Sequence, residues 1–191
     1  MKSNLKSLSI NDLCSFNKVP NSVLQNYGVS QVFLDVGFDT DDGKGLFGKD
    51  PDVYYCKTDI HASDFRLEGS GGIYIVDGSM NVDGTFVLTA ADAYTVLVVL
   101  GDLKVSHDLI HQMDSQLVIF GHTAVGGTMW INLSDAGFTV FRGPVSASRW
   151  YQTNDSVENS LLFQKAPNGK KISEQDSDFK NCQTLFESYC Y

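Results

Sequence analysis

Two of the four histidines stand at a spacing that metal sites on helices use. His107 and His111 are four residues apart, and Asp108 and Asp114 beside them could complete a set of metal ligands. The segment, however, reads as part of a strand repeat, in which residues four apart are not neighbours, and no H-E-x-x-H motif is present. We therefore expect these histidines to lie in turns facing solvent, with neither a metal nor a cofactor bound.

A second acidic group, formed by Asp39, Asp41 and Asp42, precedes Gly43 in a loop-like stretch. An EF-hand calcium loop has Gly at its sixth position and Glu at its twelfth. Here the glycine comes one place early, and Asp50 stands where the glutamate belongs. The stretch therefore predicts a solvated acidic turn rather than a calcium site.

Carboxylates also recur further along the chain, three of them directly beside glycines, with arginines following. They are Asp77, Asp83, Asp102 and Asp108, followed by Arg142 and Arg149. A lyase of the pectate type needs clustered carboxylates for calcium and a basic group that removes a proton. Turn chemistry alone favours Asp next to Gly, and a chain without long side loops offers little cleft to exclude water. We expect no enzyme, and a carbohydrate-active enzyme is the third alternative for the function.

A recurring glycine marks the architecture of the central residues. The glycines are Gly78, Gly101, Gly121 and Gly143, at spacings of 23, 20 and 22 residues. Alternating apolar residues flank each one, as in Leu97-x-Val99 before Gly101 and Leu103-x-Val105 after it. This period is typical of one turn of a parallel β-solenoid and is too short for a helical hairpin or a propeller blade. An antiparallel sandwich is the alternative, but hairpins do not require glycine at one fixed place in the alternation.

Three apolar pairs in each turn predict a triangular coil filled with apolar side chains. We expect the four glycines to stack at one corner, where they adopt backbone conformations closed to other residues, and we expect Leu103 to point inward. The whole chain, 1–191, is predicted to be a single all-β domain. It comprises an irregular N-terminal part (1–70), the short parallel β-solenoid (71–150) and a C-terminal cap (151–191).

The flanks differ from the repeat. Residues 9–16 predict a short helix, and residues 31–36 and 53–56 predict strands. Residues 173–189 predict a terminal helix with Ser173 as its N-cap. Its apolar residues Phe179, Cys182, Leu185 and Phe186 fall at helical spacing. Such a helix would cover the open end of the solenoid, where a bare strand edge invites association. A monomer or small closed oligomer is therefore expected.

The formal charge of −9, from 23 acidic and 14 basic residues, limits the classes of partner. Nucleic acid and anionic membranes both require positive surface charge, so neither is expected. No apolar run approaches the ~20 residues of a membrane span, and the first residues are too polar for a secretory signal. The four cysteines, Cys14, Cys56, Cys182 and Cys190, form no C-x-x-C pair. We expect a cytoplasmic protein with reduced thiols, although four cysteines also allow two disulfides.

Aromatic residues gather towards the last coils. They are Trp130, Phe138, Phe141, Trp150 and Tyr151. Core and end-cap packing is one interpretation, and a partner-binding face is the other, because Trp, Tyr and Arg are favoured anchors. The predicted partner site joins Asp39, Asp41, Asp42, Asp83 and Asp108, which would steer a basic partner, to the anchors Trp130, Arg149 and Trp150.

The strings IYIVDGSMNVDG (73–84) and LVVLGDLKV (97–105) resemble those of uncharacterised bacterial β-solenoid proteins. These are similar to polymer-forming bactofilin-type domains, and some small acidic ones accompany bacterial toxins as immunity partners. The resemblance implies the solenoid fold, whereas function does not transfer with a fold. Bactofilin-type chains have disordered tails, and the aromatic flanks here depart from that pattern.

Composition and resemblance together define the expected function. We expect a non-enzymatic protein-binding module, most concretely an immunity protein that neutralises a cognate toxin with a basic domain, because an acidic inhibitor is steered to a basic partner. The alternative is a structural protein that polymerises end to end through its terminal coils.

Overall fold

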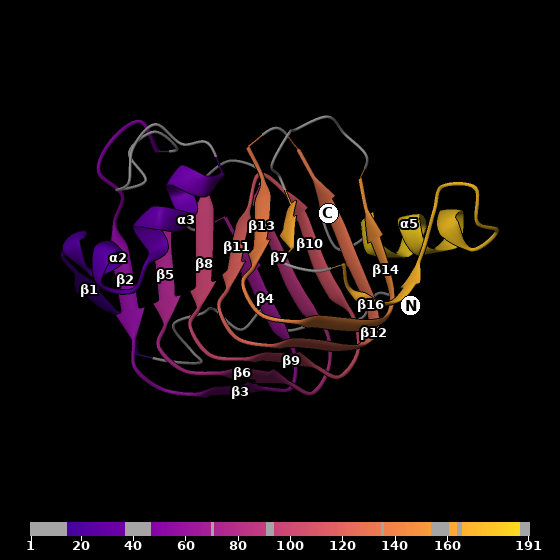
Figure 1. Cartoon of the computed structure of the whole chain (residues 1–191), viewed down its shortest axis with the longest axis horizontal. Helices are drawn as coiled ribbons and strands as arrows, with labels where there is room; N and C mark the ends of the chain where they lie inside the picture. Colours follow the sequence, from indigo (N-terminus) through magenta and orange to yellow (C-terminus); the bar gives the residue numbers. More distant parts are fainter. Residues whose placement is uncertain are drawn as a thin grey trace.

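The computed structural model describes residues 15–36, 47–69, 71–90, 94–134, 136–153, 161–163 and 166–187. In these residues the chain winds into a parallel β-solenoid with three faces, and successive coils stack side by side (Figure 1). The predicted all-β solenoid is confirmed, and so is a small C-terminal helix.

The three faces are called A, B and C here. Face A consists of β2 (Val53–Cys56), β5 (Gly72–Val76), β8 (Thr95–Val99), β11 (Gln116–Ile119), β13 (Phe138–Phe141) and β15 (Leu161–Phe163). Face B consists of β3 (Ile60–Ala62), β6 (Met80–Val82), β9 (Leu103–Val105) and the first parts of β12 (Thr123–Leu133) and β14 (Val145–Gln152). Face C consists of β4 (Phe65–Glu68), β7 (Phe86–Ala90), β10 (Leu109–Met113) and the later parts of β12 and β14. The last strand, β16 (Asn168–Lys171), pairs with both parts of β14.

The strand register reproduces the repeat read from the glycines. On face A, Val53 pairs with Ile73, Ile73 with Val96, Val96 with Gln116 and Gln116 with Phe138, which are offsets of 20, 23, 20 and 22 residues. All of these pairings are parallel, so the antiparallel sandwich is excluded for these strands. Alternate residues fill the interior, and Leu103 is fully buried there, as predicted.

The marker glycines stack at the corner between faces A and B, but for a different physical reason from the one predicted. Gly101 donates its backbone N–H to the carbonyl of Gly78 over 2.9 Å, and Gly121 donates to Gly101 over 3.1 Å. A Cβ on Gly101 would lie 2.6 Å from the carbonyl oxygen of Gly78. None of the four has a φ in the left-handed region. Glycine is required because adjacent coils approach too closely for a side chain.

The solenoid extends beyond the predicted 71–150 in both directions. Strands β2, β3 and β4 form a first coil within the part expected to be irregular, and β16 adds to the last one. The repeating glycines did not reveal the first coil, because its corner position is occupied by Thr58. Gly78 packs onto the carbonyl of Thr58, and a residue with no earlier coil beneath it can keep its side chain.

Two N-terminal helices cover the outer side of face A (Figure 1). They are α2 (Ser22–Asn26) and α3 (Val29–Asp35), and β1 (Asn17–Val19) pairs antiparallel with β2 at the sheet edge. The strand predicted for residues 31–36 is therefore wrong. Val29, Val32 and Phe33 are buried at helical spacing. The helix predicted for residues 9–16 lies mostly outside the described residues.

The C-terminal helix α5 (Phe179–Glu187) packs on the outer side of face C, whereas the sequence predicted that it would cover the open end of the solenoid. It also begins later than predicted, because residues 173–178 form turns rather than a first helical turn capped by Ser173. Phe179, Cys182 and Phe186 face the sheet, where they meet Trp130 and Tyr151. The outer side of face C is apolar, which is why it requires this cover.

The cysteines differ from the expectation of reduced thiols. Cys56 is disulfide-bonded. Cys182, on α5, is free and is buried between that helix and face C. None of the described helices has the length and apolar content needed to cross a membrane.

Candidate protein-binding face

Face B carries a row of outward side chains, one from each coil. The register aligns His61, Asn81, Lys104, Ala124, Ser146 and Asn168. Neighbours in this row are separated by the ~4.8 Å between strands. Five of the six are polar, and His61, Lys104 and Asn168 are exposed while the others are half-buried. The first five each lie between two buried residues, so the strand alternation presents them to solvent.

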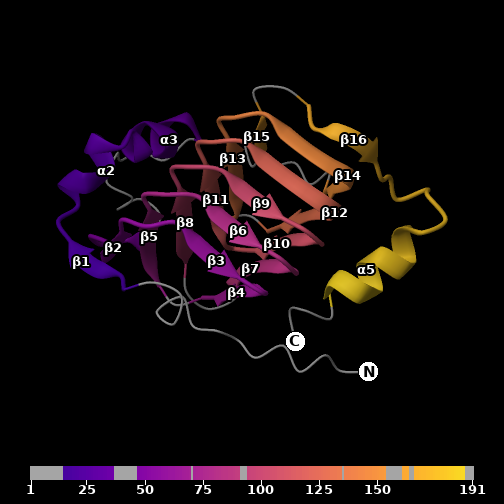
Figure 2. The same ribbon diagram turned by 90° about the horizontal axis from the view of Figure 1, so that it is seen from below.

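Face B is the only one of the three without a helix packed on it in the described part of the chain. Helices α2 and α3 bury the outer residues of face A, and α5 buries those of face C. In Figure 2, strands β3, β6 and β9 lie between the α2–α3 pair and α5. Face B is therefore the sheet surface that a partner can reach without displacing a helix.

Aspartates line both corners of face B and help to build them. At the A–B corner, Asp59 accepts the N–H of Ser79 over 2.8 Å and Asp102 accepts that of His122 over 2.7 Å. At the B–C corner, Asp64 and Asp108 accept backbone N–H groups in the same manner. Their donors are Thr85, over 2.8 Å, and Thr128, over 2.6 Å. Each bond uses Oδ1 and joins one coil to the next, so these carboxylates combine turn formation with negative charge beside the open face.

The predicted acidic residues fall into two groups. Asp83 is exposed at the B–C corner, and Asp108 is half-buried at the same corner, where it bonds to Thr128. Both flank face B, so the structure brings this part of the predicted site together. Asp39, Asp41 and Asp42 lie outside the described residues.

The predicted aromatic anchors lie on opposite sides of one sheet. Trp130 points outward beneath α5 and is 1% exposed, stacked on Tyr151 at 4.2 Å. Trp150 points into the solenoid and is 8% exposed, with the ammonium of Lys171 5.1 Å from its ring centroid. With α5 in place, neither ring can serve as an anchor for an incoming partner. Both indoles therefore belong to the packing that the sequence offered as the other interpretation.

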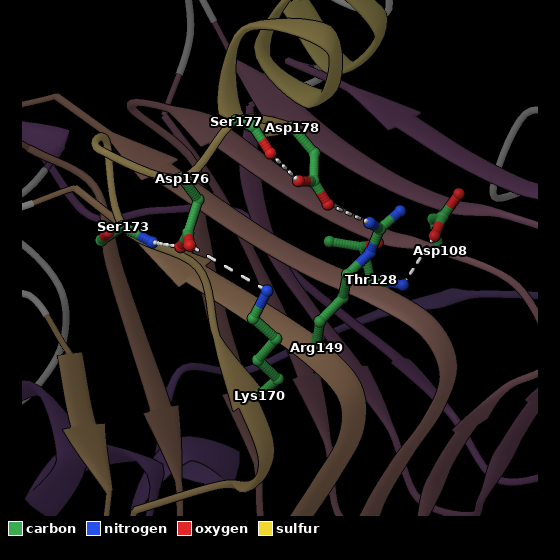
Figure 3. Close-up of polar contacts among 8 residues, drawn as sticks. All are labelled: Asp108, Thr128, Arg149, Lys170, Ser173, Asp176, Ser177 and Asp178. Atoms are coloured by element: carbon green, nitrogen blue, oxygen red, sulfur yellow. Dashed lines mark hydrogen bonds and ion pairs between the residues drawn. The ribbon is translucent and has the colours of Figure 1, made fainter.

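Arg149 holds the segment that leads into α5 (Figure 3). Its Nε donates to Thr128 Oγ1 over 2.8 Å, and its guanidinium lies 3.5 Å from the carboxylate of Asp178. Nearby, Lys170 lies 4.0 Å from Asp176. The Ser173 N–H holds the pKa of Asp176 below its usual range, with help from Lys170. Arg149 thus holds the segment that leads into α5, although its side chain remains partly exposed.

His111 differs most from the sequence expectation, because it is fully buried inside the solenoid rather than in a solvent-facing turn. Its Nε2 lies 3.0 Å from the carbonyl of Ser115 and its Nδ1 lies 2.8 Å from Thr139 Oγ1. Since a carbonyl only accepts, Nε2 carries the proton and the threonine hydroxyl donates to Nδ1. Burial lowers the pKa of His111 to about 3, so the ring is neutral. His107 is exposed, so the two do not form a metal pair.

A cluster that sequence reasoning missed ties α2 to the first coils. The hydroxyls of Tyr27 and Tyr55 are 2.8 Å apart, and both donate to the carboxylate of Asp77. Burial, followed by the bond to Asp77, raises the pKa of Tyr55 above its usual range. A phenol with a raised pKa stays protonated, so this cluster is suited to holding the helix in place and not to nucleophilic chemistry.

The described residues contain no group of three or more His, Cys, Asp or Glu side chains placed to hold a metal ion. Comparisons with protein-family models, with curated proteins and with solved structures found no match for this chain. The geometry of face B is therefore the basis for a functional assignment.

Proposed function

We propose that this protein is a non-catalytic protein-binding module and that face B with its acidic corners is the contact surface. One observation carries the proposal. The chain buries the outer sides of faces A and C under its own helices, whereas the row from His61 to Asn168 stays open. A polar sheet surface of this kind suits a partner that docks through hydrogen bonds and ion pairs.

Charge indicates which partner fits. Residues 50–115 contain 11 acidic and three basic side chains, a net charge of −8, which is close to the −9 of the whole chain. Residues 116–171 contain three acidic and five basic side chains. A basic protein would be steered towards the first coils. In its most concrete form, the proposed function is that of an immunity protein that neutralises a basic toxin domain.

The disulfide at Cys56 bears on where this interaction takes place. Disulfides persist in oxidising compartments and are rare in the cytoplasm. The bonded Cys56 thus favours an oxidising compartment over the cytoplasm that the sequence predicted, and a toxin partner would be met there.

Co-expression with the product of the adjacent gene tests the proposal. Protection of the cells and a complex on a sizing column at micromolar concentration are expected. Loss of both would remove the immunity function. A triple variant, Asp59→Asn, Asp83→Asn and Asp102→Asn, then tests the face, because asparagine keeps an acceptor for the corner N–H groups but removes the charge.

The triple variant should associate several-fold more slowly at low salt, and the difference should shrink as salt rises. The matched control removes three charges elsewhere, through Asp50→Asn, Glu68→Gln and Glu174→Gln. If the control slows association as much as the triple variant, the contact does not lie on face B.

One observation favours a second function, that of a structural protein polymerising end to end. Because α5 lies against face C, it does not cover the end of the solenoid. Among the described strands, β16 pairs only with β14, and it exposes Lys170 and Lys171. A basic last coil and acidic first coils suit head-to-tail contact between copies. Sedimentation at low and high salt distinguishes the two functions, since only a polymer grows with concentration and dissociates in salt.

A further inference from the structure

A cavity of about 310 Å³ lies at the corner where face C leads into face A in the first two coils. Phe47, Lys49, Asp50, Asp52 and Tyr54 line it together with the backbone of Gly71 and Gly72. We propose that this cavity binds one neutral sugar ring. The proposal is independent of face B, because none of these residues belongs to that face.

The aromatic wall is held rigidly. The ring of Tyr54 stacks on that of Tyr74 at 5.0 Å and 15°, and Phe16 meets Tyr74 edge-on at 5.5 Å. Phe47 is in turn edge-on to Tyr94 at 6.3 Å. The face of an aromatic ring carries a negative electrostatic potential and attracts the C–H groups on one side of a sugar ring. A wall fixed by other rings loses little conformational entropy when a ligand stacks on it.

The charged groups at the cavity balance one another. Lys18 lies 2.6 Å from Asp52, and the hydroxyl of Tyr54 donates to the same carboxylate over 3.5 Å. The bond from Lys18 holds the pKa of Asp52 below its usual range, and Lys49 contributes to this. The two lysines offset Asp50 and Asp52, so the site has no net charge to attract an ion. Ammonium donors beside carboxylate acceptors match neighbouring hydroxyls, which both donate and accept.

The glycine pair shapes the remaining wall. Gly71 and Gly72 have φ of +68° and +101°, conformations that other residues rarely adopt. A Cβ on Gly72 would lie 2.7 Å from the carbonyl oxygen of Asp52 and 3.3 Å from the ring of Tyr54. A side chain there would therefore displace two parts of the wall. The volume is at the lower end of the ~300–1,000 Å³ of ligand pockets, which suits one sugar ring rather than a chain.

Saturation-transfer NMR on the full chain tests the proposal with four neutral sugars: glucose, galactose, mannose and N-acetylglucosamine. At least one should receive saturation, strongest on the protons of one ring face, with a dissociation constant on the order of 1 mM. Phe47→Ala and Lys49→Ala should each weaken binding about fivefold or more. Tyr54→Phe, which keeps the ring, should weaken it less than Phe47→Ala.

Lys57→Ala is the matched control, because Lys57 is exposed in the first coil away from the cavity. It should bind as the unaltered chain does, and thermal unfolding establishes that each variant is folded. The proposal is overturned if none of the four sugars receives saturation. It is overturned equally if both cavity variants bind unchanged, or if charged glucosamine or glucuronate binds more tightly than every neutral sugar.

Discussion

The outer sides of faces A and B are built on the same coils, yet they meet different surroundings. On β8 of face A, Val96 and Val98 point outward and are fully buried beneath α2 and α3. On β9 of face B, which follows directly in the same coil, Lys104 is exposed. A coil requires apolar residues only on its inside. The outward residues therefore indicate what covers each face, and face B is the one that no helix of the described residues covers.

The largest effect is expected where a helix covers a face. Trp130→Ala removes a ring of face C that contacts both Phe179 and Phe186 of α5, and it should lower the free energy of unfolding by about 3–5 kcal/mol. Asn81→Ala, an outward change on face B, should alter it by no more than ~0.5 kcal/mol. Urea unfolding measures both. Equal midpoints for the two variants would show that α5 does not cover face C.

A comparison within one strand of face B comes next. Leu103→Ala should cost about 2–5 kcal/mol, because Leu103 is fully buried in the interior. Its neighbour Lys104 faces solvent, so Lys104→Ala should change stability by no more than ~0.5 kcal/mol. A urea midpoint that falls for Lys104→Ala and not for Leu103→Ala would mean that the strand is paired one residue out of register.

Acidification should distinguish the buried histidine from the exposed ones. The pKa of His111 is lowered from 6.5 to about 3 in the folded chain, so its stabilising contribution is complete above pH 6.5 and is lost as the pH falls towards 3. The slope is roughly 1.4 kcal/mol per pH unit. His111→Gln should lack this part of the acid destabilisation, and His107→Gln should retain it. Identical pH profiles for the two variants would place His111 in solvent.

The smallest effect concerns the corners of face B. Asp108→Ala leaves the N–H of Thr128 without its acceptor and should cost about 1–2 kcal/mol. Asp108→Asn keeps an acceptor in the same place and should cost less than half as much. Thermal unfolding of the two variants side by side measures the difference. If asparagine is as destabilising as alanine, charge rather than the hydrogen bond holds the corner.

The interior of the solenoid could be predicted because the coil constrains it directly. Inward positions such as Leu103 recur at the same interval as the corner glycines. Stacked coils require both, because apolar side chains fill the interior and glycines let the backbones approach closely at the corner. The same alternation could have placed His111 inside, since it is two residues after the inward Leu109 on β10. The strand register, rather than the polarity of histidine, determines its position.

The helices and their positions could be predicted only in part. Val29, Val32 and Phe33 carry a helical pattern that their β-branched and aromatic composition disguised. The sequence predicts Trp130 and Trp150 in one aromatic patch because both belong to the last coils. Trp130 pairs with Tyr151 rather than with Trp150, so the indoles lie on opposite sides of the sheet. Which face α5 covers depends on long-range packing, for which a single sequence gives no direct signal.

Hydroxyl-radical footprinting of the free protein tests the central claim, that two faces are covered and one is open. Indole is intrinsically more reactive than imidazole, yet Trp130 is 1% exposed whereas His61 is on the open face. We predict that His61 is oxidised faster than Trp130 in the folded chain and that the order reverses in urea. Trp130 reacting faster than His61 in the native protein would contradict the account, because face C would then be as open as face B.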